Sequence, residues 1–314
     1  MPTTTIYLIR HGARHDYNNP AGWKAQCNRL GIENLDPPLS ALGHQQAREV
    51  AVALKDEPIT HLLCSPYVRV LQTAQPLAQA LGKPLCVEHG LAEFKHHPAR
   101  IAPHLGVRVA VLPEVDDLYE SAFPSECFAL DQDGQEPVLE YLRRILVVAR
   151  ELPQRHAGTA IACFSHAASV ALVAALTGCD TLEAAGTFAP CGIWKLCSED
   201  GGSTWKVVQR GESNEGHVSA NDPSTYSWGF KHSRSSERCE QDWKQARRLG
   251  PTRTDGGGDS AKAKADARSA PAECKEGDMA ASSAGGGAAM GLGLALGVVL
   301  GLGVGLVLGA RRRA

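Results

Sequence analysis

Arg10 and His11 stand side by side at the end of a short apolar run, residues 4–10. In an open α/β sheet, ligands bind in the crevice outside the carboxyl ends of the strands, so we expect both side chains to face a binding site. A guanidinium can bind two oxygens of a phosphoryl group at once, and a neutral imidazole nitrogen can attack phosphorus and carry the phosphoryl group covalently. The pair therefore indicates phosphoryl chemistry, with His11 as the candidate nucleophile.

Another cation, Arg69, falls in the first turn of a helix that is predicted over residues 66–81. Ser65 is the expected N-cap, Pro66 is the first helical residue, and Gly82 stands just past the end. Free backbone N–H groups and the helix dipole favour phosphate at a helix N-terminus, and an arginine there adds positive charge. Arg69 is therefore a second candidate for binding the phosphoryl group.

His166 follows a buried apolar run, residues 159–164, and begins a helix predicted over 166–177. Glu93 offers a carboxyl group between these segments, with Glu88 as its rival a few residues earlier. A carboxyl group can protonate a leaving oxygen if its surroundings raise its pKa. The residue types alone leave the choice between the two glutamates open.

The elements that must position these side chains alternate along the chain. Strands are predicted near residues 4–10, 60–64, 84–88, 159–164, 191–197 and 204–209, and helices over 40–55, 66–81, 137–152 and 166–177. An alternation of short buried strands with helices is typical of a mainly parallel sheet that is covered on both faces. The predicted fold class is therefore α/β.

Three of the motifs above belong to longer segments of the chain, and a fourth segment follows late in the sequence. These are Arg10-His11-Gly12-Ala13-Arg14, Ser65 to Ala74, Ser165-His166-Ala167 and Phe188 to Ile193. In order and spacing they resemble the histidine phosphatase superfamily, also called the phosphoglycerate mutase-like or branch 1 family. Their finer pattern is most similar to the branch of the suppressor of T-cell receptor signalling and the ecdysteroid phosphate phosphatases. The resemblance implies a three-layer α/β/α sandwich with a mainly parallel central sheet, in a catalytic domain over residues 1–215.

The resemblance also implies a role for each polar side chain. His11 would be the nucleophile, and Glu93 would protonate the leaving oxygen and then take a proton from the water that attacks the phosphohistidine. The phosphate pocket would consist of Arg10, Arg14, Arg69 and His166. No metal ion or other cofactor is implied, because the arginines would neutralise the charge. The resulting prediction is a metal-independent phosphomonoester hydrolase.

Two other functions stay open beside hydrolysis. A phosphoglycerate mutase would return the phosphoryl group to another hydroxyl, and a membrane-tethered scaffold would bind phosphorylated partners without turnover. The 314 residues carry a net charge of -2, which gives no basic bias toward nucleic acid. The 10 cysteines are scattered without a CxxC pair, so we expect reduced thiols rather than disulfides or a zinc site.

Residues 216–284 are rich in Ser, Gly, Asp, Lys and Ala and contain few large apolar side chains. Such a composition does not bury enough apolar surface to offset the entropy of the chain, so we predict a disordered linker. Trp228, Phe230 and Trp243 interrupt it. They indicate either a docking segment or a return of the chain onto the catalytic domain.

The stretch 285–310 contains no charged side chain. It is long enough to cross a bilayer, since a spanning helix needs roughly 20 apolar residues. Glycines at every fourth position are typical of close helix packing, so we expect a homodimer through Gly293, Gly297, Gly301, Gly305 and Gly309.

Residues 311–314 form a basic tail. Because the first strand leaves no room for a signal peptide, the predicted span is a tail anchor with a cytosol-facing catalytic domain, on a mitochondrial, peroxisomal or plastid outer membrane.

Overall fold

The computed structural model describes residues 2–30, 36–94, 116, 118–223 and 225–251. The strands are β1 (Thr4–Arg10), β2 (Ile59–Cys64), β3 (Leu85–Val87), β4 (Ala160–Ser165), β5 (Ile193–Ser198) and β6 (Lys206–Gln209). The α-helices are α1 (His15–Asn18), α2 (Pro20–Leu30), α3 (Ala41–Leu54), α4 (Val68–Leu81), α6 (Val138–Arg155), α7 (Val170–Thr177) and α8 (Ser236–Leu249). Short 3-10 turns are η1 (His89–Leu91), η2 (Ser125–Cys127), η3 (Ala167–Ser169), η4 (Glu183–Ala185) and η5 (Phe230–His232).

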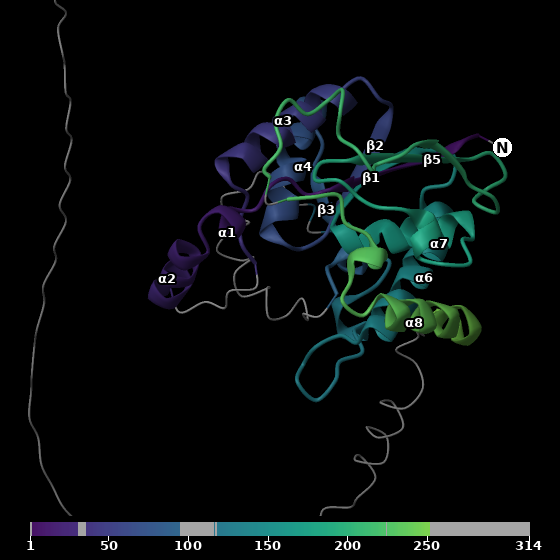
Figure 1. The fold of residues 1–314 in the computed structure, drawn as a ribbon. Coiled ribbons are helices and arrows are strands. Elements are labelled where there is room, and N and C mark those ends of the chain that lie inside the picture. The colour runs from purple at the N-terminus through teal and green to yellow at the C-terminus, as the bar shows by residue number, and fades with distance from the viewer. Residues whose placement is uncertain (1, 31–35, 95–115, 117, 224, 252–314) are drawn as a thin grey trace, which may run out of the picture. The chain divides into compact units, whose positions relative to one another are not determined.

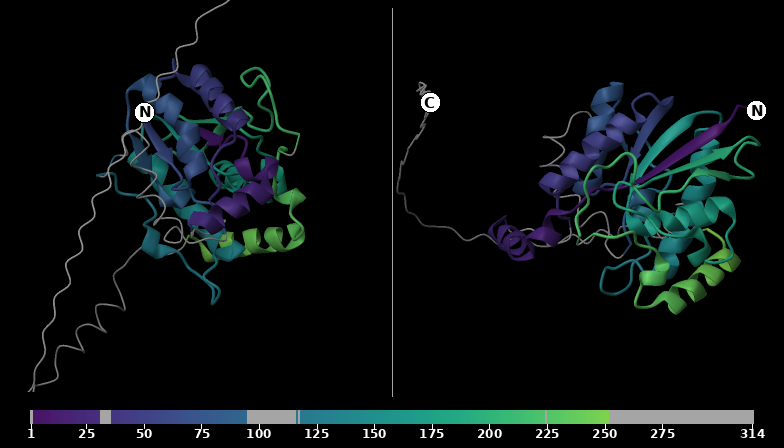
Figure 2. Two further views of the ribbon diagram at one scale, coloured as in Figure 1. Left: turned by 90° about the vertical axis from the view of Figure 1, so that its left-hand side faces the viewer. Right: turned by 45° about the horizontal axis from the view of Figure 1, so that its top comes forward.

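In the described ranges, the strands form one sheet in the order β3-β2-β4-β1-β5-β6. β1, β2, β3 and β4 pair in parallel, whereas β5 and β6 are antiparallel additions at one edge. The predicted α/β class with a mainly parallel sheet is therefore confirmed. Helices α3 and α4 lie on one side of the sheet, and α6 and α7 lie on the other (Figures 1 and 2).

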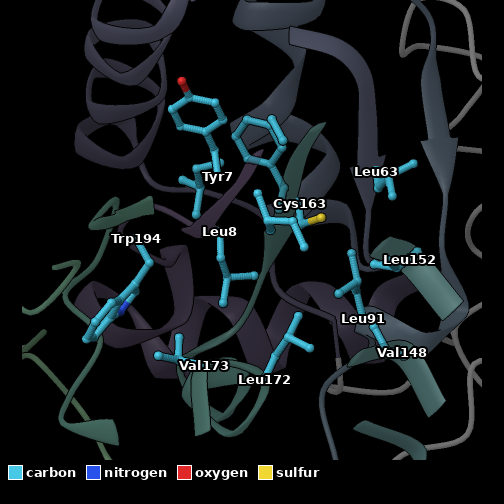
Figure 3. Close-up of a cluster of buried hydrophobic side chains, with 14 of the residues drawn as sticks. Tyr7, Leu8, Leu63, Leu91, Val148, Leu152, Cys163, Leu172, Val173 and Trp194 are labelled. Atoms are coloured by element: carbon cyan, nitrogen blue, oxygen red, sulfur yellow. The ribbon is translucent and has the colours of Figure 1, made fainter. Parts of the chain in front are cut away.

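The central strands are apolar because both of their faces are covered. Every residue of β4 is buried. Side chains of β1 point alternately to the two helical layers: Figure 3 shows Tyr7 and Leu8 on opposite sides of the strand, with Leu172 and Val173 of α7 on the side of Leu8. The apolar core thus lies in two layers, one on each face of the sheet.

The register of the central strands determines where the functional side chains meet. Arg10, the last residue of β1, lies opposite Ser165, the last residue of the parallel strand β4. The residues that follow, His11 and His166, therefore leave neighbouring strands at the same edge of the sheet. This is the carboxyl-end crevice in which the sequence places the site.

The ends of α4 confirm one prediction and correct another. Gly82 ends the helix in the left-handed conformation, with a φ of 60°. The helix begins at Val68, however, and not at Pro66, so the expected N-cap at Ser65 is wrong. The N–H of Val68 instead donates to the buried carboxylate of Asp36, at 3.0 Å. The hydroxyl of Ser65 contacts His166 and does not cap the helix.

The ordered part of the chain continues past residue 215, so the predicted disorder from residue 216 onward is wrong up to residue 251. Helix α8 is amphipathic: Cys239, Trp243 and Ala246 recur at helical spacing and are buried. The indole N–H of Trp243 donates to the carbonyl of Cys179, at 3.2 Å. Phe230 is also buried. The aromatic residues that interrupt the polar composition thus attach this segment to the domain, because they supply the apolar surface that their neighbours lack.

The remaining C-terminal predictions fall on residues 252–314, outside the described residues. They are the rest of the linker, the span 285–310 with its glycine repeat, and the basic tail. Among the helices that the structure describes, none has the length and apolar character needed to cross a bilayer. The membrane anchor, the homodimer and the cellular location therefore stay predictions from the sequence.

Candidate active site

A pocket of about 400 Å³ opens at the carboxyl ends of β1 and β4. Four of the predicted site residues line it: Arg10, His11, Arg14 and Glu93. The other two, Arg69 and His166, are buried directly beside them, with the imidazole rings of His11 and His166 5.5 Å apart. The fold thus brings together all six residues that the sequence indicated.

His11 is held as a neutral imidazole with one defined tautomer. Its Nδ1 lies 2.8 Å from the carbonyl oxygen of Gly12, and a carbonyl only accepts, so Nδ1 carries the proton. Burial and the charges of Arg69 and Arg10 lower the pKa of His11 well below its ordinary value of 6.5. Nε2 therefore keeps its lone pair, which is the state required of a nucleophile.

The backbone around His11 is fixed by α3 and α4. The N–H of Gly12 donates to Thr73 of α4 at 3.1 Å, and the N–H of Ala13 donates to Gln46 of α3 at 2.9 Å. A Cβ atom at residue 12 would lie 2.8 Å from the carbonyl oxygen of Gly43, so the close approach of α3 requires glycine there. Ser40 caps α3 by accepting from the N–H of Gly43.

His166 takes the opposite tautomer from His11. Arg69 Nη2 lies 3.1 Å from His166 Nδ1, and a guanidinium only donates, so Nδ1 is the acceptor. His166 Nε2 then donates to Ser65 Oγ, at 2.7 Å. Burial and the charge of Arg69 lower the pKa of His166 well below the usual value, which keeps the ring neutral. Arg69 also lies 3.5 Å from Asp36, so one carboxylate both caps α4 and orients the arginine.

Arg10 and Arg14 reach the pocket in different ways. Arg10 Nη1 donates to the carbonyls of Phe188, at 2.6 Å, and Tyr226, at 2.9 Å, while its buried Nε has no partner among the described residues. Burial lowers the pKa of Arg10 to about 10, which leaves it charged at neutral pH. Arg14 is instead bonded to both carboxylate oxygens of Asp16, at 3.0 and 2.7 Å. Its charge is thus balanced within the chain, a feature that the sequence did not indicate.

The two candidate glutamates have different surroundings. Glu93 lines the pocket, with Oε2 3.6 Å from His166 Nδ1 and a buried Oε1 that has no hydrogen-bond partner in the part of the chain that the structure describes. Burial raises the pKa of Glu93, although Arg69, Arg14 and Arg10 oppose the shift. Glu88 is fully buried away from the pocket and accepts hydrogen bonds from Gly90, Tyr119, Ser121, Ala122 and Phe123. The geometry places Glu93 as the carboxyl group that can reach a substrate.

Sequence reasoning missed the outer wall of the pocket. Tyr17, Phe94, Thr225, Tyr226 and Trp228 line it. Three of these come from the segment that we expected to be disordered, which returns to the site because Trp228 pairs its backbone with Phe188. The aromatic interruptions noted above were the available signal. Over the described residues, no cluster of three or more His, Cys, Asp or Glu side chains is arranged to hold a metal ion.

Comparison with known proteins shows the family of the chain. The family model of the histidine phosphatase superfamily (branch 1) matches residues 6–210, and the chain belongs to that superfamily. A probable phosphoglycerate mutase GpmB of Escherichia coli is 36% identical over 89 residues, which cover 28% of this chain and 37% of that relative. The chain thus matches only about a third of the length of that curated relative.

Solved structures were also matched, at low sequence identity. The ecdysone phosphate phosphatase from Bombix mori, in complex with tungstate, superposes with a TM-score of 0.48 at 20% identity, covering 70% of this chain and 97% of that one. A mycobacterial glucosyl-3-phosphoglycerate phosphatase gives a TM-score of 0.46 at 21% identity, covering 67% and 100%.

Proposed function

We propose that this protein is a metal-independent phosphomonoester hydrolase that works through a phosphohistidine on His11. The observation that carries the proposal is the hydrogen bond from His11 Nδ1 to the carbonyl of Gly12. It leaves a neutral Nε2 beside Arg10 and Arg69, in a pocket that Glu93 also lines. A nucleophile, a set of cations for a phosphoryl group and an acid of raised pKa therefore occupy one site.

In the first step, Nε2 of His11 attacks phosphorus and the bond from phosphorus to the leaving oxygen breaks. Protonated Glu93 gives its proton to that oxygen, so a neutral alcohol leaves. In the second step, water attacks the phosphohistidine while the Glu93 carboxylate takes a proton from it. Inorganic phosphate leaves, and His11 and Glu93 return to their starting states.

In this proposal the arginines of the pocket stabilise the charge of the phosphoryl group. Arg10, Arg14 and Arg69 would donate to the phosphoryl oxygens, and Arg69 would turn from His166 Nδ1 toward the phosphoryl group when it binds. The release of Nδ1, together with the incoming negative charge, favours protonation of His166 as a further donor. Each such preorganised donor is worth about 3 kcal/mol, on the order of a hundredfold in rate.

The test is phosphate release from p-nitrophenyl phosphate by the full chain in the presence of EDTA. We compare wild type with His11→Ala, and with His61→Ala as the matched control, since His61 is exposed on β2 and takes no part in the pocket. Turnover that survives EDTA, vanishes in His11→Ala and persists in the control supports the proposal. Trapping an acid-labile phosphoenzyme only where His11 is present supports the covalent step.

A phosphoryl transferase is the second candidate, because the relative of 36% identity is a probable phosphoglycerate mutase. A transferase would use the same His11 and Glu93, but another hydroxyl would accept the phosphoryl group in place of water. A folded wild type that interconverts phosphoglycerates without releasing phosphate would replace the hydrolase proposal with this one. A wild type that binds phosphate without either reaction would indicate a scaffold.

A further inference from the structure

The backbone leading to Glu93 is held by side chains from two other elements. Arg144 of α6 donates from Nη1 to the carbonyl of Gly90, at 2.7 Å, and to that of Ala92, at 3.2 Å. Ser165, at the end of β4, donates to the intervening carbonyl of Leu91, at 2.7 Å. All three carbonyls that precede Glu93 are therefore bound by buried side chains.

Arg144 is itself fixed by a buried ion pair. Its Nε and Nη2 donate to the two carboxylate oxygens of Glu136, at 2.7 and 2.5 Å, and both side chains are almost fully buried. The rings of Phe128 and Tyr141 lie against the guanidinium, 4.5 and 4.9 Å from its central carbon. A buried ion pair often stabilises a protein no better than apolar residues of the same volume. This pair also fixes Arg144 Nη1, which donates to the carbonyls of Gly90 and Ala92.

The residue after Glu93 is held by the same helix. The ring of Phe94 packs on that of Tyr141, with 5.5 Å between their centroids. Tyr141 and Arg144 are three positions apart on α6 and therefore share one face. This face of α6 thus contacts Ala92 on one side of Glu93 and Phe94 on the other.

The carboxyl group of Glu93 is supported by the backbone N–H of the adjacent Phe94. Within the described residues its Oε1 has no hydrogen-bond partner, and Oε2 is 3.6 Å from His166 Nδ1. Its position in the pocket therefore depends on the backbone on either side of it. A displacement of about 1 Å at a reacting group costs on the order of a hundredfold in rate.

We propose that Arg144, paired with Glu136, is a positioning residue for the proton donor Glu93. The inference rests on the proposed function, because it assigns Arg144 to the step in which Glu93 protonates the leaving oxygen. Protonation by Glu93 matters most when the leaving group is a strong base. A p-nitrophenolate leaves with little protonation, whereas an alkoxide needs a proton as the bond breaks.

The experiment compares kcat/KM for p-nitrophenyl phosphate and for β-glycerophosphate in the full chain. The test variant is the double substitution Glu136→Met with Arg144→Met, which leaves no unpaired buried charge. The matched control is Glu140→Met with Arg143→Met, an ion pair on the same helix whose arginine does not contact residues 90–92. We expect the test variant to lose on the order of thirtyfold to a hundredfold on the alkyl substrate and less than about threefold on the aryl substrate. The control should lose neither.

Glu93→Gln provides the reference pattern. If Arg144 acts through Glu93, adding the double substitution to Glu93→Gln causes no further selective loss on the alkyl substrate, because the two changes remove the same contribution. Arg144→Lys, which keeps the buried charge but not the guanidinium fork, should show the same selectivity, with a smaller loss of thermal stability than Arg144→Met alone, because Glu136 keeps a cationic partner.

An equal loss on both substrates, or no loss on either, overturns the inference and leaves Arg144 with a purely structural role. The proposed function fails in a different way. In that case the wild type releases no phosphate from either substrate, before any variant is compared.

Discussion

The two ends of the pocket are built differently. At the phosphate end, Arg10, His11, Arg69 and His166 are buried, and each is oriented by hydrogen bonds to the chain. At the outer end, Tyr17 is 44% exposed and Tyr226 is 57% exposed. The inner residues follow or begin core elements, whereas the outer ones come from a short helix and from an irregular segment before α8.

This difference indicates that the two ends of the pocket have different roles. Polar groups that are buried and held by hydrogen bonds to the chain are largely preorganised for one charge distribution. Exposed aromatic side chains on loops can be exchanged without disturbing the core. We therefore expect substitutions at the phosphate end to change the rate of the chemical step, and substitutions at the outer end to change which phosphomonoester is preferred.

The largest effect is expected from Arg69→Met. The variant removes a phosphoryl-binding cation, leaves Asp36 with one partner fewer and frees His166 Nδ1. We expect kcat/KM to fall on the order of a hundredfold or more on every phosphomonoester, together with a lower melting temperature. Steady-state kinetics on aryl and alkyl substrates checks the result. A loss confined to one substrate would contradict the assignment of Arg69 to the phosphate end.

An intermediate effect is expected from Glu93→Gln, and it depends on pH. As a general acid Glu93 must be protonated, so the wild-type rate on β-glycerophosphate falls as pH rises through the raised pKa of Glu93. His11 must be unprotonated, so the loss of activity on the acid side lies well below pH 6.5. Glu93→Gln should lower the alkyl rate on the order of a hundredfold or more and abolish the alkaline decline. An unchanged alkaline limb in the variant would assign the proton donor to another group.

The smallest effect is expected from Tyr226→Ala, at the outer end. The contact that orients Arg10 uses the backbone carbonyl of Tyr226, which alanine retains, so kcat should change little. The lost ring should raise KM by a few-fold for substrates with a large apolar leaving group, because a half-exposed ring contributes roughly 1 kcal/mol of apolar contact. For β-glycerophosphate KM should stay the same. A large fall in kcat on both substrates would show that the outer wall is part of the catalytic machinery.

The fold and the phosphate end were largely predictable from the sequence. Arg10, His11 and His166 are positioned by strands whose apolar runs are local and whose parallel register follows from the α/β pattern. Arg69 was predicted from the helix start, even though Asp36 rather than Ser65 caps that helix. An error of two residues in the predicted start of a helix does not change these assignments, because the side chains still lie at the same edge of the sheet.

The remainder required the tertiary structure. Glu88 and Glu93 are chemically identical, and the burial of Glu88 by Ser121, Ala122 and other distant partners excludes it from the pocket. The pairing of Trp228 with Phe188 was also not predictable, because the residues around Trp228 in the sequence are polar and indicate a disordered segment.

The sequence by itself determined the class of reaction, since the strand ends and helix starts that carry Arg10, His11, Arg69 and His166 are specified by neighbouring residues. Only the tertiary structure decided which carboxyl group faces the substrate and which segment forms the outer wall. Arg144 binds the carbonyl of Ala92 beside Glu93, and Arg10 binds the carbonyl of Tyr226, across long separations in the chain. Local patterns of hydrophobicity and capping do not encode such pairings, because they depend on the packing of the complete core.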